Sequence, residues 1–359
     1  MSTQLPRARR PREVWVDVAK GIAIALVVLD HSRHLTNMLG LPVHDIWHWI
    51  GSTFASVRMP AFFMMSGFFL YRWKTRGWRS FFKGRIQGFV YLYFVWATVY
   101  FVVDGLVVRH LDDRVLMLTR SGPIQHILRI DTPLWYLMAL PLFSLIWWAT
   151  RKWPAWIPLG IAFIGYIGTQ WGWLQWPSVI STVGTIGFTH YLFAFLIGAR
   201  LNGYIRDLVP RANVWHLLAF VAVWMTLVFV NPPIPGLRFF VAVPSLFIIA
   251  AFIARSDRLA GPFVSIGKRT LPVYVTHWLL LEIQLGIGLR WLEQLPEWSG
   301  WLITPGLWVS STVLAILFWK ATNRWHWLWA RPDVDPVSLH GSVLTPPQVS
   351  RPTGYRRIQ

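Results

Sequence analysis

The first long apolar stretch of the chain, residues 12–35, carries several ionisable side chains. Among them are Asp17, Lys20, Asp30 and His31. Ionisable groups inside a membrane segment are costly, and they usually serve a function. Lys20 and His31 are eleven residues apart, so a helix places both on one face, about 16 Å apart along its axis. A cation low on this face and a histidine high on it could hold the two ends of a long ligand.

His31 is the candidate for proton transfer. We expect it in the outer half of the bilayer, where it could act as a general base, the commonest role of histidine in proton transfer. The alternative is an interfacial histidine that is tolerated near the lipid headgroups. Asp30 projects about 100° away from it around the helix, so this carboxylate either tunes His31 or faces another neighbour.

Arg58 lies in the second apolar stretch, at a depth similar to that of His31. Its guanidinium stays charged and therefore needs an anion or polar partners. It could pair with Asp30, or it could be catalytic and stabilise the oxyanion of an acyl-transfer intermediate. Ser66 and Gly67, later in the same stretch, are expected to permit close helix packing.

Two later stretches carry candidate supporting residues. Trp135 and Tyr136 follow a proline that suits the first turn of a helix, and they could anchor this helix or line a cavity. Tyr274 and His277 lie near the start of another apolar stretch, which puts His277 about 9 Å above the inner boundary, near the level of Lys20. The alternative for His277 is a hydrogen bond to a neighbouring helix without a role in chemistry.

Residues 72–87 hold a group of cations between two apolar stretches. Arginine and lysine are the usual partners of phosphate, so Arg72, Arg79 and Arg85 could bind the phosphates of a cytoplasmic cofactor. The alternative is a topology signal alone, because cytoplasmic loops are basic. The cations of this segment are Arg72, Lys74, Arg76, Arg79, Lys83 and Arg85.

The elements that must position these residues are membrane spans. The chain has 359 residues, of which 55% are hydrophobic and 14% are charged, against about 25% charged residues in soluble domains. With ~20 residues for each span, we expect an all-α integral membrane protein, a bundle of about ten transmembrane helices. The predicted spans are residues 14–36, 50–71, 88–108, 133–149, 156–174, 180–199, 214–230, 237–254, 271–290 and 301–320.

Basic residues in alternate loops indicate the orientation. Lys and Arg are absent from the loops at residues 37–49, 175–179 and 231–236, whereas the intervening loops and the tail after residue 320 carry them. This pattern places both termini in the cytoplasm. It also accounts for the net charge of +19, so no nucleic-acid partner is expected. Residues 1–13 are expected to form a basic tail, and residues 321–359 a disordered one.

Several familiar chemistries are absent from the sequence. The chain contains no cysteine, which excludes disulfides and thiol catalysis. It has no P-loop, no Gly-x-Ser-x-Gly elbow and no His-Glu-x-x-His pair, so nucleotide-driven transport and a metal site are not expected.

Four of these stretches together resemble the acyltransferase-3 family of integral membrane acyltransferases, which includes bacterial sugar O-acetylases. Lys20 and His31 match the family's Arg/Lys-x10-His motif, and Arg58 stands at an often basic position of its second-span motif. TPLWYL resembles a Leu-Trp-Phe-Leu element with Tyr136 in place of Phe, and IGKRTLPVYVTH resembles a Gly–Ser–Tyr–x–x–His element. The likeness covers residues 12–320, and Asp30 departs from the glycine that is common before the histidine.

The resemblance implies a membrane acyltransferase domain over residues 14–320, in the inner membrane of a bacterium. It implies transfer of an acyl group, normally acetyl, from cytoplasmic acyl-CoA to a hydroxyl of a cell-envelope glycan or glycolipid. His31 and Arg58 would be catalytic, and Lys20 with Arg72, Arg79 and Arg85 would hold the donor. The residues that would support the site or bind substrate are Asp30, Trp135, Tyr136, Tyr274 and His277.

Two other functions fit the same residues. A transporter or flippase for a lipid-linked or small anionic molecule could use Lys20, Arg58 and His31 as a binding and proton-relay site. In a non-catalytic membrane scaffold, these polar groups would destabilise the membrane spans and would have no function. The sequence leaves open the acceptor, the acyl chain and the oligomeric state, including a homo-oligomer.

Overall fold

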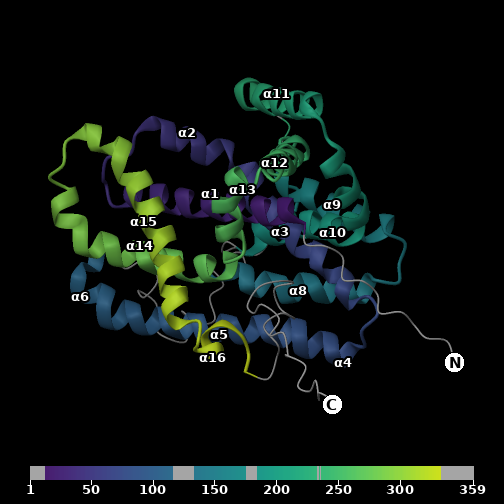
Figure 1. Ribbon diagram of the computed structural model, residues 1–359, viewed down its shortest axis with the longest axis horizontal. Coiled ribbons are helices and arrows are strands. Elements are labelled where there is room, and N and C mark those ends of the chain that lie inside the picture. The colour runs from purple at the N-terminus through teal and green to yellow at the C-terminus, as the bar shows by residue number, and fades with distance from the viewer. Residues whose placement is uncertain (1–12, 116–132, 175–183, 233, 235, 333–359) are drawn as a thin grey trace, which may run out of the picture.

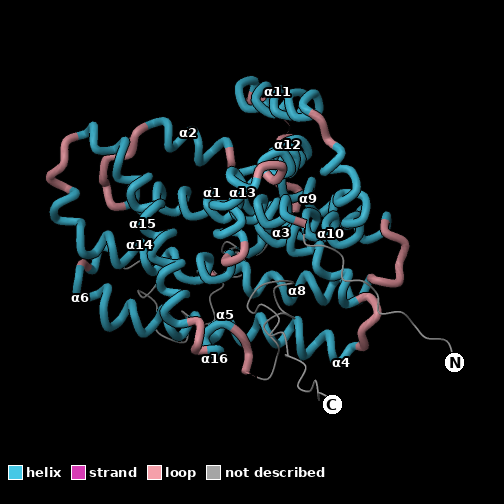
Figure 2. Tube along the Cα trace, viewed as in Figure 1, coloured by secondary structure: helices cyan, strands magenta, loops and turns pink. Residues whose placement is uncertain are grey.

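The computed structural model describes residues 13–115, 133–174, 184–232, 234 and 236–332. Over these ranges the chain forms helices joined by short loops and turns, and no strand occurs among them (Figure 2). The expected tails, residues 1–12 and 333–359, lie outside the described part. The expectation of an all-α protein is therefore confirmed for the part of the chain that the structure describes.

The helices follow one another along the chain with little intervening loop. Their bounds are α1 Val14–Met38, α2 Asp45–Thr53, α3 Ala55–Phe68, η1 Phe69–Trp73, α4 Trp78–Phe81, η2 Phe82–Ile86, α5 Gln87–Val103, η3 Asp104–Val108, α6 Arg109–Leu111, η4 Asp113–Val115, α8 Trp135–Thr150, α9 Trp156–Gln170, α10 Gly184–Leu208, η5 Val209–Arg211, α11 Val214–Val230, α12 Phe239–Ile253, α13 Asp257–Gly267, α14 Thr270–Leu292, η6 Glu297–Ser299, α15 Gly300–Thr322 and α16 His326–Trp329. The segments η2 and η3 are π-helical, and η1, η4, η5 and η6 are 3₁₀ helices.

Each predicted span overlaps a helix or a run of consecutive helices, but four details differ from the expectation. The second span bends by 41° between α2 and α3. The third helical run begins at Trp78, ten residues earlier than predicted, and takes in part of the basic segment. The helix α13 occupies residues that were expected to form a loop, and α16 follows α15 where a tail was expected.

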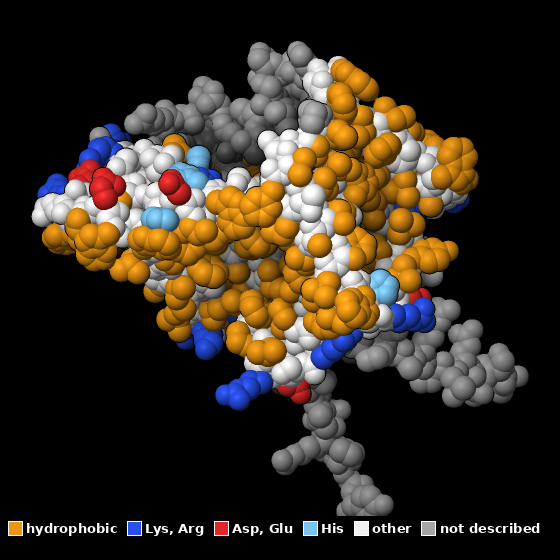
Figure 3. Space-filling model, turned by 90° about the horizontal axis from the view of Figure 1, so that it is seen from above, with side chains coloured by type: hydrophobic (Ala, Val, Ile, Leu, Met, Phe, Trp, Pro, Cys, Tyr) orange, Lys and Arg blue, Asp and Glu red, His pale blue; other side chains and the backbone are white. Residues whose placement is uncertain are grey.

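By length and composition, few of these helices alone could cross a membrane. Among the described residues, the runs Trp78–Leu111 and Glu297–Thr322 meet that test singly, and two bent helix pairs meet it together. Hydrophobic side chains cover most of the middle of the face seen in Figure 3, and charged side chains lie mainly toward its margins. The number of spans is therefore left between two and four by this criterion, and the expected ten remain a proposal.

Helix α1 lies at the centre of the bundle and is surrounded by α3, α12, α13, α14 and α15 (Figure 1). We call the end of the bundle at which α1 begins the inner end. The loops that follow η1 and α8 lie at the inner end, and the loops that follow α1 and α14 lie at the opposite, outer end. Successive long helices thus run in opposite directions.

Two helix crossings at the centre depend on glycine. A Cβ on Gly21 of α1 would lie 2.1 Å from the carbonyl oxygen of Phe263 in α13, and a Cβ on Gly67 of α3 would lie 2.2 Å from that of Phe195 in α10. Side chains at these positions would force the backbones apart, which is why small residues gather at membrane helix contacts. The predicted packing role of Gly67 is therefore confirmed.

Candidate active site

The central polar contact joins His31 of α1 to His277 of α14. The Nδ1 atom of His31 lies 2.8 Å from the Nε2 atom of His277, and the two rings are stacked with 9° between their planes. His277 is fully buried, at 0% exposure, whereas His31 is half-buried. The indole of Trp278 meets the His31 ring edge-on at a centroid distance of 5.1 Å.

The hydrogen bonds of His277 determine where the protons sit. Its Nδ1 atom lies 3.0 Å from the carbonyl oxygen of Val273, and a carbonyl oxygen can only accept, so Nδ1 carries the proton. If the His277 ring is neutral, its Nε2 has no proton and is an acceptor. It therefore accepts a hydrogen bond from the N–H at Nδ1 of His31. His31 is left with an unprotonated Nε2, the form that a general base needs.

This contact corrects the expected depth of His277. The sequence placed His277 near the level of Lys20, about 16 Å below His31, whereas the two histidines touch. The reason is α13, which lifts the start of α14: a Cβ on Gly267 would lie 1.9 Å from the carbonyl oxygen of Asp17 and 3.1 Å from the nitrogen of Gly21. From Gly21 to His31 the chain rises by about 15 Å within α1, and after the turn at Lys268 and Arg269 it rises by about 10 Å within α14 from Thr270 to His277.

Arg58 and Asp30 form an ion pair next to His31. The Nη2 atom of Arg58 lies 2.7 Å from Asp30 Oδ2, and its Nη1 donates to the carbonyl oxygen of Gly51 at 2.7 Å. Asp30 also binds Arg33, whose Nη2 lies 3.0 Å from Oδ1. The pairing of Arg58 with Asp30, one of the alternatives for Arg58, is therefore observed. Asp30 faces Arg58 and Arg33 rather than His31.

The outer cluster of Asp30, Arg33 and Arg58 ties α1 to α2 and α3. Arg33 Nη1 lies 3.1 Å from Nδ1 of His48 in α2. A Cβ on Gly51 would lie 2.6 Å from Arg33 Nε and 2.9 Å from Asp30 Oδ1, so the glycine leaves the room that this cluster occupies. Arg33 was not among the predicted site residues, although its position three residues after Asp30 places it on the same helix face.

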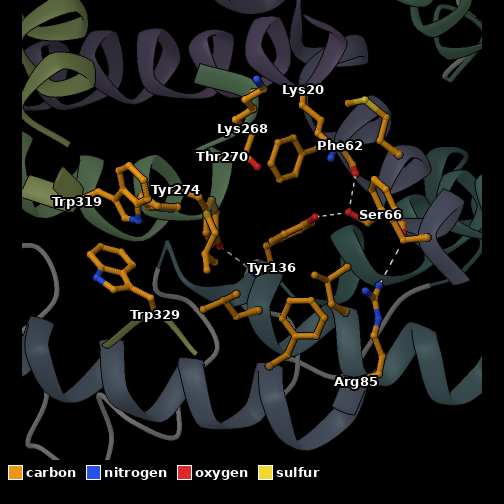
Figure 4. Close-up of a pocket in the computed structure, with 18 residues that line it drawn as sticks. Lys20, Phe62, Ser66, Arg85, Tyr136, Lys268, Thr270, Tyr274, Trp319 and Trp329 are labelled. Atoms are coloured by element: carbon orange, nitrogen blue, oxygen red, sulfur yellow. Dashed lines mark hydrogen bonds between the residues drawn. The ribbon is translucent and has the colours of Figure 1, made fainter. Parts of the chain in front are cut away.

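A cavity of about 80 Å³ lies nearer the inner end, between α1, α3, η2, α8, α14 and α15. Three cations contribute to its wall, Lys20, Arg85 and Lys268. Figure 4 shows Lys20 and Lys268 at the top, Ser66 and Arg85 on one side, and the indoles of Trp319 and Trp329 together on the side away from Ser66. This volume has room for only a few water molecules. Ligand pockets span ~300–1,000 Å³, so the lining side chains have to move before a larger molecule can bind.

Polar residues of the cavity wall are joined by hydrogen bonds. Tyr274 donates its hydroxyl proton to the carbonyl oxygen of Pro133 and accepts the N–H of Tyr136 at 3.2 Å. The Tyr136 hydroxyl contacts Ser66 Oγ, which donates to the carbonyl oxygen of Phe62 at 2.9 Å. Tyr274 lines the cavity, and His277 follows it by one helical turn.

The basic segment is divided by the fold. Arg85 is only 2% exposed and lies in the π-helix η2, where its Nε donates to Ser144 Oγ at 3.3 Å and its Nη2 to the carbonyl oxygen of Ser66 at 3.4 Å. π-Helical turns are frequent at functional sites. Arg79 is exposed on α4 and Arg72 lies beside Tyr71, and neither lines the cavity.

Other predicted residues lie around these two groups. Lys20 has its Nζ 3.9 Å from Asp17 Oδ1 and 4.3 Å from the ring centroid of Phe69. Trp135 does not line the cavity; its indole packs 5.5 Å from the ring of Tyr191. Lys268, which does line the cavity, was not among the predicted site residues. Among the described residues no group of three or more His, Asp or Glu side chains is placed to hold a metal ion.

Comparisons with known proteins identify the family of the chain. The acyltransferase-3 family, described as an acyltransferase domain, matches residues 13–320, and the chain belongs to this family. It is therefore a membrane protein with an acyltransferase domain. The inner membrane protein YcfT of Escherichia coli strain K12 is 23% identical over 302 residues, which are 76% of this chain and 81% of that protein. No solved structure matches the chain significantly.

Proposed function

We propose that the protein is a membrane O-acyltransferase that moves an acetyl group from cytoplasmic acetyl-CoA to a hydroxyl of a cell-envelope glycan or glycolipid. The observation that carries the proposal is the His31–His277 pair, because it gives a half-buried histidine a free Nε2 at the centre of an acyltransferase-3 domain. Acyl transfer to a hydroxyl needs such a base near the thioester carbonyl.

In the proposed reaction His31 first accepts a proton and then returns it. Nε2 of His31 takes the proton of the acceptor hydroxyl as its oxygen attacks the thioester carbonyl, and the C–S bond then breaks while the new C–O ester bond remains. The proton passes from Nε2 to the leaving thiolate, which departs as the free thiol of CoA. During this cycle His31 Nδ1–H keeps its hydrogen bond to His277, and that bond stabilises the transient imidazolium.

Arg58 supplies positive charge next to the base. Its guanidinium is held by Asp30 and by the carbonyl oxygen of Gly51, so its position is set before substrate binds. Fixed positive charge near a developing oxyanion lowers the barrier without reorganisation. Asp30 thus acts as a positioning residue for Arg58.

The donor would bind from the inner end. Lys20, Lys268 and Arg85 line the cavity there, and cations are the usual partners of phosphate. Arg72 and Arg79 lie outside the cavity and could attract the donor before it binds. The arm of the donor would then run along α1 toward His31.

The orientation rests on the charge pattern together with the arrangement of the loops. Ten helices or helix runs coincide with the predicted spans, and the loops after η1 and α8, which are basic, share the inner end (Figure 1). We propose ten spans in a bacterial inner membrane with both termini in the cytoplasm.

The test is transfer of label by the purified protein. Protein in lipid vesicles is incubated with acetyl-CoA labelled in the acetyl group and with an extract of cell envelope, and His31→Gln serves as the control. Label in a glycan or glycolipid with wild type alone supports the proposal. No transfer by wild type, with movement of an anionic solute across the vesicle membrane that His31→Gln abolishes, would favour the transporter alternative.

A further inference from the structure

The chain turns back on itself after α15, and this return lies beyond the residues that match the family. We call residues 323–331 the C-terminal segment; it contains α16, and the family match ends at residue 320. Leu328, Trp329 and Ala330 are exposed by only 4%, 2% and 2%. The segment packs against α5, with α16 beside that helix in Figure 1.

Hydrogen bonds hold the C-terminal segment in place. Trp96 Nε1 of α5 donates to the carbonyl oxygen of Leu328 at 3.0 Å, and the Tyr91 hydroxyl donates to that of Trp327 at 2.9 Å. Trp329 Nε1 donates to the carbonyl oxygen of Thr322 at 3.1 Å. The orientation of the Trp329 indole is therefore fixed by its own hydrogen bond and by its segment.

The Trp329 indole forms part of the wall of the cavity. It lines the cavity next to Trp319, on the side away from Ser66 (Figure 4). The other walls carry the cations Lys20, Lys268 and Arg85. The cavity thus combines cations on some walls with two indoles on another, and indoles offer large apolar area with little loss of side-chain freedom.

We propose that Trp329 is a donor-contact residue and that the C-terminal segment holds its indole in the donor site. This inference rests on the proposed function. The indole of Trp329 supplies an apolar surface for the uncharged arm of the donor, while the cations face its phosphates. The donor site of this chain is then completed by residues outside the acyltransferase-3 domain itself.

The test compares two tryptophans of the same short helix. Trp329→Ala removes the cavity-lining indole, whereas Trp327→Ala removes an indole that is 51% exposed and does not line the cavity. Labelled CoA without an acyl group is the probe in equilibrium binding to the purified full chain. Loss of a central aromatic contact costs about 2 kcal/mol or more, so Trp329→Ala should weaken CoA binding by at least about 30-fold.

Three controls separate contact from folding. Trp329→Phe should restore most of the CoA affinity because it keeps an aromatic surface, and Trp327→Ala should bind as wild type does. In transfer assays Trp329→Ala should raise the KM for donor and leave the KM for acceptor unchanged.

The inference is overturned if Trp329→Ala binds CoA as well as wild type or better, or if Trp327→Ala loses as much affinity. It is also overturned if Trp329→Phe folds, by its thermal midpoint, yet binds no better than Trp329→Ala. Wild type that neither binds CoA nor transfers acetyl overturns the proposed function as well.

Discussion

The Nδ1 atom of His31 lies 2.8 Å from the Nε2 atom of His277, and Val273 fixes the direction of this hydrogen bond from the far side of His277. A backbone carbonyl thereby determines the tautomer of a histidine on another helix. The consequence is that Nε2 of His31 is the atom available to take a proton.

Replacement of His31 tests the base directly. A general base contributes about 10²–10⁴-fold to the rate, so His31→Ala and His31→Gln should both lower kcat by about that factor, because neither carries a basic nitrogen. The measurement is single-turnover acetyl transfer by purified protein, with the amount of folded protein checked by size-exclusion chromatography. A folded His31→Gln protein that retains near wild-type transfer would refute the assignment.

Replacement of His277 tests the orienting role. Gln can still accept a hydrogen bond from His31 Nδ1–H, whereas Leu cannot. Without a hydrogen-bond acceptor at position 277, the Nδ1–H group of His31 is left unpaired at a cost of about 1–3 kcal/mol. His277→Leu should therefore lower kcat by about 5–150-fold, at 1.36 kcal/mol per factor of ten. His277→Gln should lose less, with the acceptor KM unchanged in both. Equal losses for Gln and Leu would show that His277 does something other than accept this hydrogen bond.

The sequence predicted the parts of the site that lie within one helix. Lys20 and His31 share α1, and the regular geometry of one helix fixes their relative positions. The pairing of Arg58 with Asp30 was also among the alternatives, because a buried arginine needs an anion. These predictions needed only periodicity and the cost of burying charge.

The sequence could not predict contacts that depend on where one helix begins against another. The depth of His277 was wrong because α13 lay in a region expected to be a loop, and only the packing of Gly267 on Gly21 shows how far α14 is raised. Arg85 belongs to the basic segment in sequence, yet it lies inside the bundle because the helical run begins at Trp78. Trp329 joins the cavity only because the chain folds back after α15.

The Asp30–Arg58 pair predicts a non-additive pair of substitutions. If Asp30 acts by holding Arg58, Asp30→Asn should lower kcat, and adding it to Arg58→Gln should cost little more, because contacting residues couple by about 0.5–3 kcal/mol. The measurement is kcat for both single variants and the double variant, with thermal midpoints recorded for each. Losses that multiply in the double variant would mean that Asp30 and Arg58 act independently.

The proposed orientation predicts opposite sides for two loops. Residue 45 begins α2 at the outer end, and residue 78 begins α4 at the inner end. Fusions of a reporter that is active only outside the cytoplasm should be active after residue 45 and inactive after residue 78. The same result at both positions would contradict the ten-span arrangement.

The positions of the cations relative to the cavity predict which of them bind the donor. Lys268 and Arg79 are both exposed, but Lys268 lines the cavity and Arg79 on α4 does not. A hydrogen bond to a charged group contributes about 1.5–3 kcal/mol, so loss of a direct contact with the donor phosphates in Lys268→Ala should raise the donor KM by roughly 10–150-fold. Arg79→Gln, the matched control, should change it by less than about twofold, since an exposed charge without a direct contact to the donor contributes little. Donor and acceptor KM values are measured for each variant at two salt concentrations, and the small effect of Arg79 should disappear at high salt because exposed charges are screened. An equal rise for both variants would show that the overall positive charge of the inner end, rather than the cavity, holds the donor.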